Sequence, residues 1–292
     1  MQLSKKNKGK RFFILIILFL GLIVNYKISV QHELQFQEAK KEQKSSIETE
    51  TIVTRADQET KYTNVVPIEL STMQEDVLIE NAGDYLLSGE FEGNICINAE
   101  EQIVHLFLDN VKINSSNGPA IRINSAGKVI ITLLEGTENY LYDSGKYQMA
   151  DEEDACVYSV CDLTLNGNGI LEIYGYFKDA VHGKDKVKII NSTINIKAKR
   201  EGIRANDGIY MDGACVNIEC ENDGLRTTNS GNNGRGTIEI LNSSISVIAG
   251  RYAINSENNL LISNTAEYLK GIVSNYYENG KTYSVRETVQ NE

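Results

Sequence analysis

An acidic residue, a small residue and an apolar residue recur in that order through the C-terminal half of the chain. The phrase reads Asp179-Ala180-Val181, Glu201-Gly202-Ile203 and Asp223-Gly224-Leu225, with a spacing of 22 residues both times. If each repeat is one coil of a parallel β-structure, equivalent acids stack about 4.7–4.9 Å apart. Two like charges at that distance repel by roughly 3 kcal/mol at an effective dielectric constant of about 20. The acids therefore need a cation or ion-pair partners.

Calcium is the cation that these acids predict, because it takes about six to eight oxygen ligands and carboxylates of adjacent coils converge on one ion. Asp154 stands one place out of line in an earlier, degenerate copy of the phrase. A second file follows the small residue of each phrase by five positions, and its oxygens suit either calcium or the capping of corner turns. The candidate metal ligands are Asp154, Asp179, Glu201 and Asp223 in the first file, and Asp185 and Asp207, with Asn229 and Asn258 in line, in the second.

An ion-pair ladder is the alternative to calcium at the first file, since Lys178, Arg200 and Arg204 lie close to the acids in sequence. Arg204 and Arg226 occupy the same place in successive coils. They are candidates to clamp a sugar carboxylate, to join the ion-pair ladder, or to take a proton from a uronate in a lyase reaction, a part that Lys184 could also play.

Carbohydrate binding usually recruits aromatic side chains, and this chain has no tryptophan. Tyr174 and Tyr176 share one strand face next to Asp179 and are the best pair for stacking on a sugar. The wider set of candidate tyrosines is Tyr140, Tyr142, Tyr147, Tyr158, Tyr210 and Tyr252. We assign no catalytic residue, because the three histidines (His32, His105 and His182) are isolated and no nucleophile phrase lies near them.

The elements that must position these residues are short β-runs separated by Asn, Asp and Gly. A period of 20–25 residues built this way is typical of a solenoid. Tight turns such as Asn191-Ser192 and Asp212-Gly213 precede strands with alternating apolar residues, for example Ile194 and Ile196. The sequence predicts an all-β fold, a single-stranded parallel β-helix in which each repeat is one coil.

Several segments in order strengthen this prediction and resemble a known family. They are Gly83–Gly89, Ile130–Asn139, Val157–Leu163, Leu165–Gly169 and Asn222–Arg226. Together they resemble the clostridial-type carbohydrate-binding β-helix family, whose fold is similar to that of pectate-type polysaccharide lyases. The resemblance implies an exported right-handed β-helix that binds calcium and polysaccharides, including acidic ones. Where coils of that family carry a first acid, this chain has Lys178, Arg200 or Asn222, so the number of calcium ions stays open.

Charge and cysteine content exclude other classes. The net charge is −11 although residues 1–11 contain five basic residues and no acid. The remainder is thus strongly acidic, which makes nucleic-acid binding improbable. The five cysteines include no Cys-x-x-Cys pair, which argues against a zinc site, and most are expected to be small core residues.

The N-terminal segment predicts export. Basic residues precede thirteen residues, Phe12 to Val24, that have no polar side chain, which is typical of a signal peptide or an uncleaved signal anchor with its basic end in the cytoplasm. The predicted organisation is a signal or transmembrane helix over 1–30, a polar stalk over 31–75, the β-helix over 76–263 and a tail or cap over 264–292. We expect a secreted or membrane-anchored polysaccharide-binding protein that uses calcium. A calcium-dependent lyase and a structural or adhesion solenoid are the alternatives.

Overall fold

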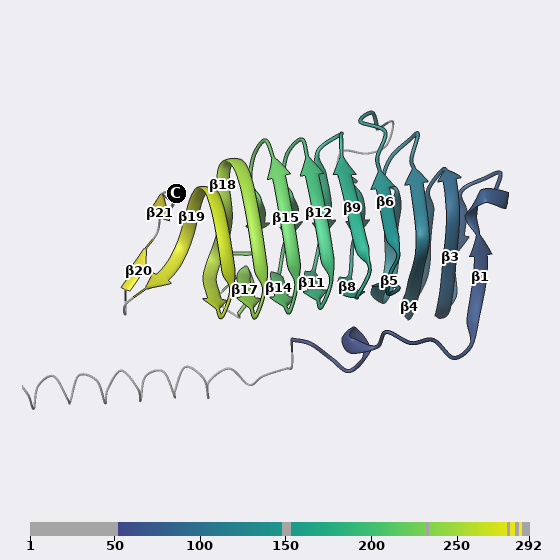
Figure 1. Ribbon diagram of the computed structural model, residues 1–292, viewed down its shortest axis with the longest axis horizontal. Helices are drawn as coiled ribbons and strands as arrows, with labels where there is room; N and C mark the ends of the chain where they lie inside the picture. The colour runs from purple at the N-terminus through teal and green to yellow at the C-terminus, as the bar shows by residue number, and fades with distance from the viewer. Residues whose placement is uncertain (1–51, 148–152, 232–233, 279–280, 284–285, 288–292) are drawn as a thin grey trace, which may run out of the picture. The chain divides into compact units, whose positions relative to one another are not determined.

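The computed structural model describes residues 52–147, 153–231, 234–278, 281–283 and 286–287. Residues Val53–Glu292 form one compact unit (Figure 1). The apolar run of Phe12 to Val24 lies outside the described residues, and none of the helices within them is long and apolar enough to span a membrane.

The unit is a solenoid of parallel strands, which confirms the predicted all-β parallel fold (Figure 1). Three ladders of strands follow from the pairing register, and we name them ladders A, B and C. Long strands bend at the corners and so belong to more than one ladder.

Ladder A contains the acidic phrases. Its strands are β2 (Val77–Ile79), the start of β4 (Ile95–Asn114), β5 (Ile121–Leu133), β7 (Ala155–Ser159), β10 (Asp179–Gly183), β13 (Ile203–Ala205), β16 (Leu225–Thr227), the middle of β18 (Ser244–Ser263) and part of β19 (Ala266–Glu278).

Ladder B follows ladder A within each coil. It is formed by β1 (Val65–Glu69), β3 (Gly83–Glu92), the middle of β4, the end of β5, β8 (Asp162–Gly167), β11 (Lys186–Ile190), β14 (Gly208–Asp212), β17 (Thr237–Leu241) and the end of β18.

Ladder C closes the coil. It is formed by the ends of β3 and β4, β6 (Glu138–Tyr142), β9 (Ile170–Gly175), β12 (Thr193–Ala198), β15 (Cys215–Cys220) and the starts of β18 and β19.

Alternation within each strand explains the core, because every second side chain points into the coil. In β12, Ile194 and Ile196 are buried, whereas Asn195 between them is half-buried on the outside. The register keeps apolar residues in line from coil to coil, as in the column of Ile173, Ile196, Ile218 and Val247.

The corner between ladders B and C needs a left-handed backbone conformation, which Asn and Gly adopt at least cost. Asn110, Asn191 and Asn242 have φ values of 54°, 50° and 49° at this corner. Gly213 has a φ of 64°, and a Cβ there would lie 2.2 Å from Oδ1 of Asn191. The turn residues that predicted the coils therefore have a steric reason for their positions.

Both ends of the solenoid extend past the expected limits of 76 and 263. At the N-terminal end β1 pairs in parallel with β3, and short 3-10 turns occupy Ala56–Gln58 (η1) and Leu70–Thr72 (η2). At the C-terminal end β19 pairs with β18, and β20 (Lys281–Tyr283) and β21 (Arg286–Glu287) add antiparallel pairs to β19.

The expected polar stalk over 31–75 is wrong for its C-terminal part. Asp57 is fully buried and binds residues of ladder B, and Leu70 belongs to the hydrophobic core. Charge-rich composition concealed this packing, because a single buried carboxylate leaves no periodic signal in the sequence.

All five cysteines are free thiols, and four of them (Cys96, Cys156, Cys161 and Cys220) are buried. The prediction that most are small core residues is confirmed.

Candidate functional site

The acidic phrases lie at the entry to successive strands of ladder A. Asp179 opens β10, and its coil neighbour in register is Ala155, which confirms that Asp154 is one place out of line. The backbone N–H of Asp179 donates to the Asp154 carbonyl at 3.0 Å. Glu201 and Asp223 precede β13 and β16 at the same position of the next two coils. All four acids are buried, so their charges need partners inside the protein.

The residue before the acid position of the following coil supplies that partner by reaching back one coil. Arg200 donates to Asp179 through Nε at 2.7 Å and through Nη2 at 2.6 Å. Asn222 donates to Oε1 of Glu201 at 2.9 Å. Arg251, in the coil that follows Asp223, donates to both oxygens of that residue at 2.7 and 2.6 Å. The first file is thus an ion-pair ladder, the alternative that the sequence left open.

Arg200 lies at the centre of this ladder. Besides Asp179, its Nη2 donates to Oδ2 of Asp154 at 2.5 Å, and its Nε forms an ion pair with Glu201. One guanidinium therefore serves three buried carboxylates.

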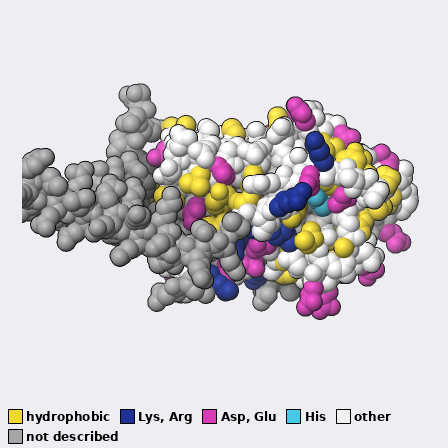
Figure 2. All heavy atoms as spheres, turned by 90° about the horizontal axis from the view of Figure 1, so that it is seen from below, with side chains coloured by type: hydrophobic (Ala, Val, Ile, Leu, Met, Phe, Trp, Pro, Cys, Tyr) yellow, Lys and Arg dark blue, Asp and Glu magenta, His cyan; other side chains and the backbone are white. Residues whose placement is uncertain are grey.

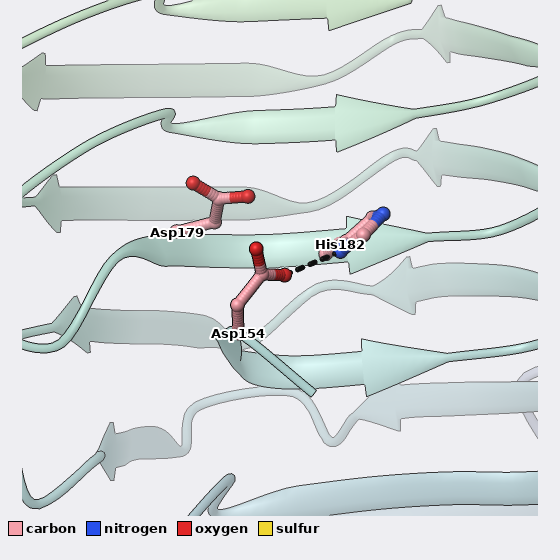
Figure 3. Close-up of side chains that lie close together, drawn as sticks. All are labelled: Asp154, Asp179 and His182. Carbon is pink, nitrogen blue, oxygen red and sulfur yellow. Dashed lines mark hydrogen bonds and ion pairs between the residues drawn. The ribbon is translucent and has the colours of Figure 1, made fainter. Parts of the chain in front are cut away.

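His182 is part of the same cluster, although the sequence treats it as isolated. Its Nδ1 lies 2.7 Å from Oδ1 of Asp154 (Figure 3). Burial is the largest influence on His182 and lowers the pKa of its imidazole despite the Asp154 carboxylate, so the ring is neutral at pH 7. Its Nε2 is buried and has no hydrogen-bond partner among the described residues.

The carboxyl groups of the ladder respond to both burial and their arginines. Burial and then the neighbouring Glu201 raise the pKa of Asp179, although Arg200 opposes that shift. Burial works against ionised Glu201 as well, but its hydrogen bond with Asp179 and the charges of Arg200 and Arg226 lower its pKa to about 2. Burial is also outweighed at Asp154, whose pKa the contacts with His182 and Arg200 lower.

A metal ion is conceivable at this cluster on geometry alone, because Asp154, Asp179 and His182 each present one ligand atom and these atoms lie within 4.8 Å of one another (Figure 3). The donor set does not suit calcium, which prefers oxygen ligands throughout. Both aspartates already accept hydrogen bonds from Arg200. The first file therefore does not fit calcium as long as Arg200 is present.

Arg204 and Arg226 lie beside the ladder, in register with each other and with His182. Nη1 of Arg226 lies 3.0 Å from Oε1 of Glu201, and Nη1 of Arg204 lies 3.9 Å from Oδ2 of Asp154. Both side chains are partly exposed. Both arginines pair with acids of the ladder. Arg204 lies farther from its acid than Arg226 does, so its ion pair is the weaker one.

The second file lines an open groove between ladders A and B. The groove has a volume of about 560 Å³, and Asp185, Asp207, Asn206 and Asn229 contribute oxygens to it. Burial, and then the charges of Asp162 and Asp207, raise the pKa of Asp185 to about 6. Arg235 reaches Asp207 at 3.3 Å. Lys184 and Arg235 line the same groove, and Asn229 donates to Asp207 at 2.6 Å, so the acids of this file have partners as well.

Tyrosines gather on the outer face of ladder C. Tyr142 of β6 and Tyr174 of β9 are in register and stack with centroids 4.7 Å apart at 13°. Tyr140 lies 6.4 Å from Tyr142, and Tyr176 lies 6.0 Å from Tyr174. Tyr176 at the margin is 52% exposed. We call Tyr140, Tyr142, Tyr174 and Tyr176 the tyrosine cluster.

Polar side chains border the tyrosine cluster. Glu172 lies next to Tyr140 in register, and Asn195 of the following coil donates to Glu172 at 2.6 Å. Hydroxyl, carboxylate and amide groups beside aromatic rings are the groups that bind sugar hydroxyls and sugar faces. The other candidate tyrosines are dispersed; Tyr147, for example, packs on Phe177 and donates to Asp143.

The face of the protein in Figure 2 carries acidic and basic side chains next to one another. That face has no uniformly basic area of the kind that phosphate backbones require.

Sequence reasoning found the acids and offered Arg200 as an ion-pair partner, but it did not show that Arg200, Asn222 and Arg251 each reach back one coil to the preceding acid. Lys178, Arg200 and Asn222 stood out as departures from the family pattern, and that departure was the usable signal. Arg251 precedes Tyr252, where the acid of the phrase is absent, so the phrase did not mark it. The Asp154–His182 contact left no signal, because it joins positions 28 residues apart outside the phrase register.

Comparisons with known proteins agree with this architecture. The family described as carbohydrate-binding domain-containing protein matches residues 73–288. A protein of that description from Acetivibrio thermocellus is 34% identical over 135 residues, which are 44% of this chain and 47% of the relative. The chain thus spans about half the length of that curated relative.

A solved structure is also similar. It is the polysaccharide lyase-like protein from C. thermocellum in its gadolinium derivative, with a TM-score of 0.63 and 25% sequence identity. The alignment covers 72% of this chain and 95% of that one.

Proposed function

This chain belongs to the family of carbohydrate-binding domain-containing proteins, and from that membership we propose that it binds polysaccharide through the tyrosine cluster of ladder C without chemically altering it. The observation that carries the proposal is the gathering of four tyrosines from adjacent coils on one outer face. Aromatic stacking on sugar faces and hydrogen bonds from neighbouring polar groups are a sequence-tolerant way to hold a long polymer.

Tyr176 is the residue on which we expect binding to depend most. Tyr142 and Tyr174 cover each other's ring faces, whereas Tyr176 is the most exposed member and its ring is available to a sugar. The bordering Glu172 and Asn195 would accept from and donate to sugar hydroxyls. Tyr174 is part of the same surface and supports the Tyr176 ring.

The test is retention of the purified exported domain on insoluble polysaccharides, with Tyr176→Ala compared with the wild type. We expect Tyr176→Ala to lower retention at least fivefold with an unchanged Tm, because the removed ring is largely exposed. Tyr268→Ala is the matched control, since Tyr268 is 42% exposed on β19, on ladder C but several coils away from the tyrosine cluster. Equal loss in both variants, or no loss in either, would reject the tyrosine cluster as the binding surface.

We place calcium at the second file rather than the first. Asp185 and Asp207 supply carboxylate oxygens to an open groove. Burial, and then the charges of Asp162 and Asp207, raise the pKa of Asp185 to about 6, and a bound cation would oppose that shift. Calcium titration by calorimetry should show binding that Asp185→Asn removes and Asp179→Asn leaves in place. If Asp179→Asn alone loses calcium binding, the ion binds at the first file and this placement is wrong.

A calcium-dependent lyase is the enzyme alternative, with Arg204, Arg226 or Lys184 as the base. Arg226 is held by Glu201, and an arginine keeps its proton in proteins. Incubation with polygalacturonate and calcium should therefore give no unsaturated product that absorbs in the ultraviolet. Appearance of that product, lost in Arg204→Met, would establish the lyase.

The proposed location is outside the cytoplasm, with right-handed coils as in the resembling family. It is supported by the basic and apolar N-terminal sequence, whose residues 1–30 lie outside the described part of the chain. Fractionation of cells that express the full chain tests export and anchoring together. A protein found in the cytoplasmic fraction would contradict both.

A further inference from the structure

The segment Thr54–Tyr62, which we call the strap, runs alongside the coils before the chain enters β1 (Figure 1). Its side chains are exposed or half-buried with a single exception. Asp57, in η1, is fully buried. Asp57 is therefore the one side chain of the strap that is fully buried against the solenoid.

Ladder B surrounds that carboxylate with donors. Thr164 of β8 donates to Oδ1 of Asp57 at 2.6 Å, and Nζ of Lys128 lies 2.9 Å from the same oxygen. Nζ of Lys188 lies 3.3 Å from Oδ2, and Lys188 is only 2% exposed. Burial opposes ionisation of Asp57, but the contacts with Thr164, Lys128 and Lys188 outweigh it and lower the pKa of the carboxyl.

The donors continue along the ladder beside this pocket. Nδ2 of Asn166 donates to the backbone carbonyls of Asp57 and Glu59 at 2.9 and 3.0 Å. Thr132 donates to Asn166, and Phe107 presents its ring to Tyr62 of the strap at 5.0 Å. A carboxylate pocket, an amide that binds oxygen atoms and an aromatic ring thus lie together under the strap.

These groups match the chemistry of a uronic acid, which combines a carboxylate, hydroxyl oxygens and an apolar ring face. We propose that this surface of ladder B is a second saccharide site, selective for a uronate carboxylate, and that the strap closes it by inserting Asp57 as an internal ligand. The proposal rests on the proposed function only for the class of ligand. The place of the site, its selectivity for a charged sugar and its closure by the strap do not depend on the tyrosine cluster.

Exchange of the strap for a saccharide conserves the buried charge, because one carboxylate replaces another between Lys128 and Lys188. Lys188 also keeps its pairing with Asp162 at 3.0 Å, and Lys128 exchanges one carboxylate for another. Neither lysine is then left without an acid, which for a buried charge is the costly outcome. The strap also leaves room beside the pocket. A cavity of about 440 Å³ is lined by Arg55 and Glu59 from the strap and by Asp84 and His105 from ladder B.

The strap itself provides the readout, because Arg55 and Lys61 are exposed and are trypsin cleavage sites on either side of Asp57. We expect oligogalacturonate to accelerate cleavage at these two bonds at least fivefold in the wild-type protein. A neutral oligogalactoside of equal length should have no effect. Asp57→Asn should be cleaved quickly without ligand, and Gln58→Ala, at the exposed position next to it, should behave like the wild type.

Cleavage that oligogalacturonate leaves unchanged in the wild type would overturn the proposal. So would an Asp57→Asn variant that is cleaved quickly yet binds oligogalacturonate no better than the wild type in calorimetry, since Asp57 would then be a purely structural partner of Lys188. The Tyr176→Ala variant separates the two sites. If Tyr176→Ala loses polymer retention but oligogalacturonate still releases its strap, this inference stands and the proposed binding surface is the one affected. If the wild type retains polymer but oligogalacturonate does not release its strap, this inference alone is refuted.

Discussion

Arg200→Met removes the guanidinium that three buried carboxylates share while keeping an unbranched apolar stem. Asp154, Asp179 and Glu201 are each buried and each contact Arg200. Breaking a buried ion pair on one side costs about 3–5 kcal/mol. For a domain of this size each kcal/mol shifts the Tm by about 2–4 °C, so we expect the Tm to fall by roughly 6–20 °C.

Thermal unfolding followed by circular dichroism measures this change. Lys197→Met is the matched control, because Lys197 pairs with Glu219 at 3.7 Å with both side chains about two-thirds exposed. Exposed pairs contribute little, so we expect that control to shift the Tm by no more than about 2 °C.

The pH dependence of the stability of the Arg200→Met variant is a second test of the ion-pair ladder. Arg200 lowers the pKa of all three acids, and that of Asp179 is raised even in its presence. Without Arg200 all three pKa values should rise, so the folded variant binds protons more tightly than the folded wild type and loses less stability as the pH falls. In the wild type the lowered pKa of Glu201 gives stability that is present above about pH 4.5 and is lost as the pH falls toward 2. The difference in Tm should therefore narrow between pH 7 and pH 4. A loss no larger than that of the control, or a difference independent of pH, would refute the ion-pair interpretation of the ladder.

Three further outcomes follow from the structure. The raised pKa of Asp185, about 6 against a usual 3.8, means that stability is fully present below pH 3.8 and is lost as the pH rises through 6. The stability of Asp185→Asn relative to the wild type should therefore increase by about 1 kcal/mol between pH 4 and pH 7 in urea titrations, after the full shift is discounted for solvent screening. A stability difference that does not change with pH would contradict this. Gly213→Ala should cost about 1–3 kcal/mol, because a Cβ would meet Asn191 in a left-handed turn, and an unchanged midpoint of urea unfolding would show that the corner relaxes. Native thiol labelling should reach Cys215 first, because it is the one cysteine that is not buried and burial raises the pKa of Cys156, Cys161 and Cys220; early labelling of Cys156 would mean that the coils open locally.

Much of the fold was determined by the sequence, because the signals that specify it are local and repeated. The alternation of Ile194 and Ile196 assigns the inner face of a strand, and turn residues such as Asn191 mark the corner where a left-handed residue is needed. The 22-residue spacing then sets the register, so the alignment of Glu201 with Asp223 could be predicted before any coordinates.

What neutralises those acids was decided only by the tertiary structure. Arg200 and Lys178 precede acids in the same way, yet Arg200 contacts three acids within 3 Å, whereas Nζ of Lys178 lies 4.0 Å from its nearest acid, Asp154. The outcome depends on side-chain length and on the direction of each stem across a coil. Neither property has a period in the sequence.

The strap shows the same limit more strongly. Asp57 binds Lys128 and Lys188, which lie 71 and 131 residues away, and no repeat relates those positions. Local spacing determined the solenoid and the places of its acids, because each coil repeats the same backbone geometry. Only the folded chain brought single side chains from distant coils to one carboxylate, because such contacts depend on where the surfaces of the finished solenoid lie.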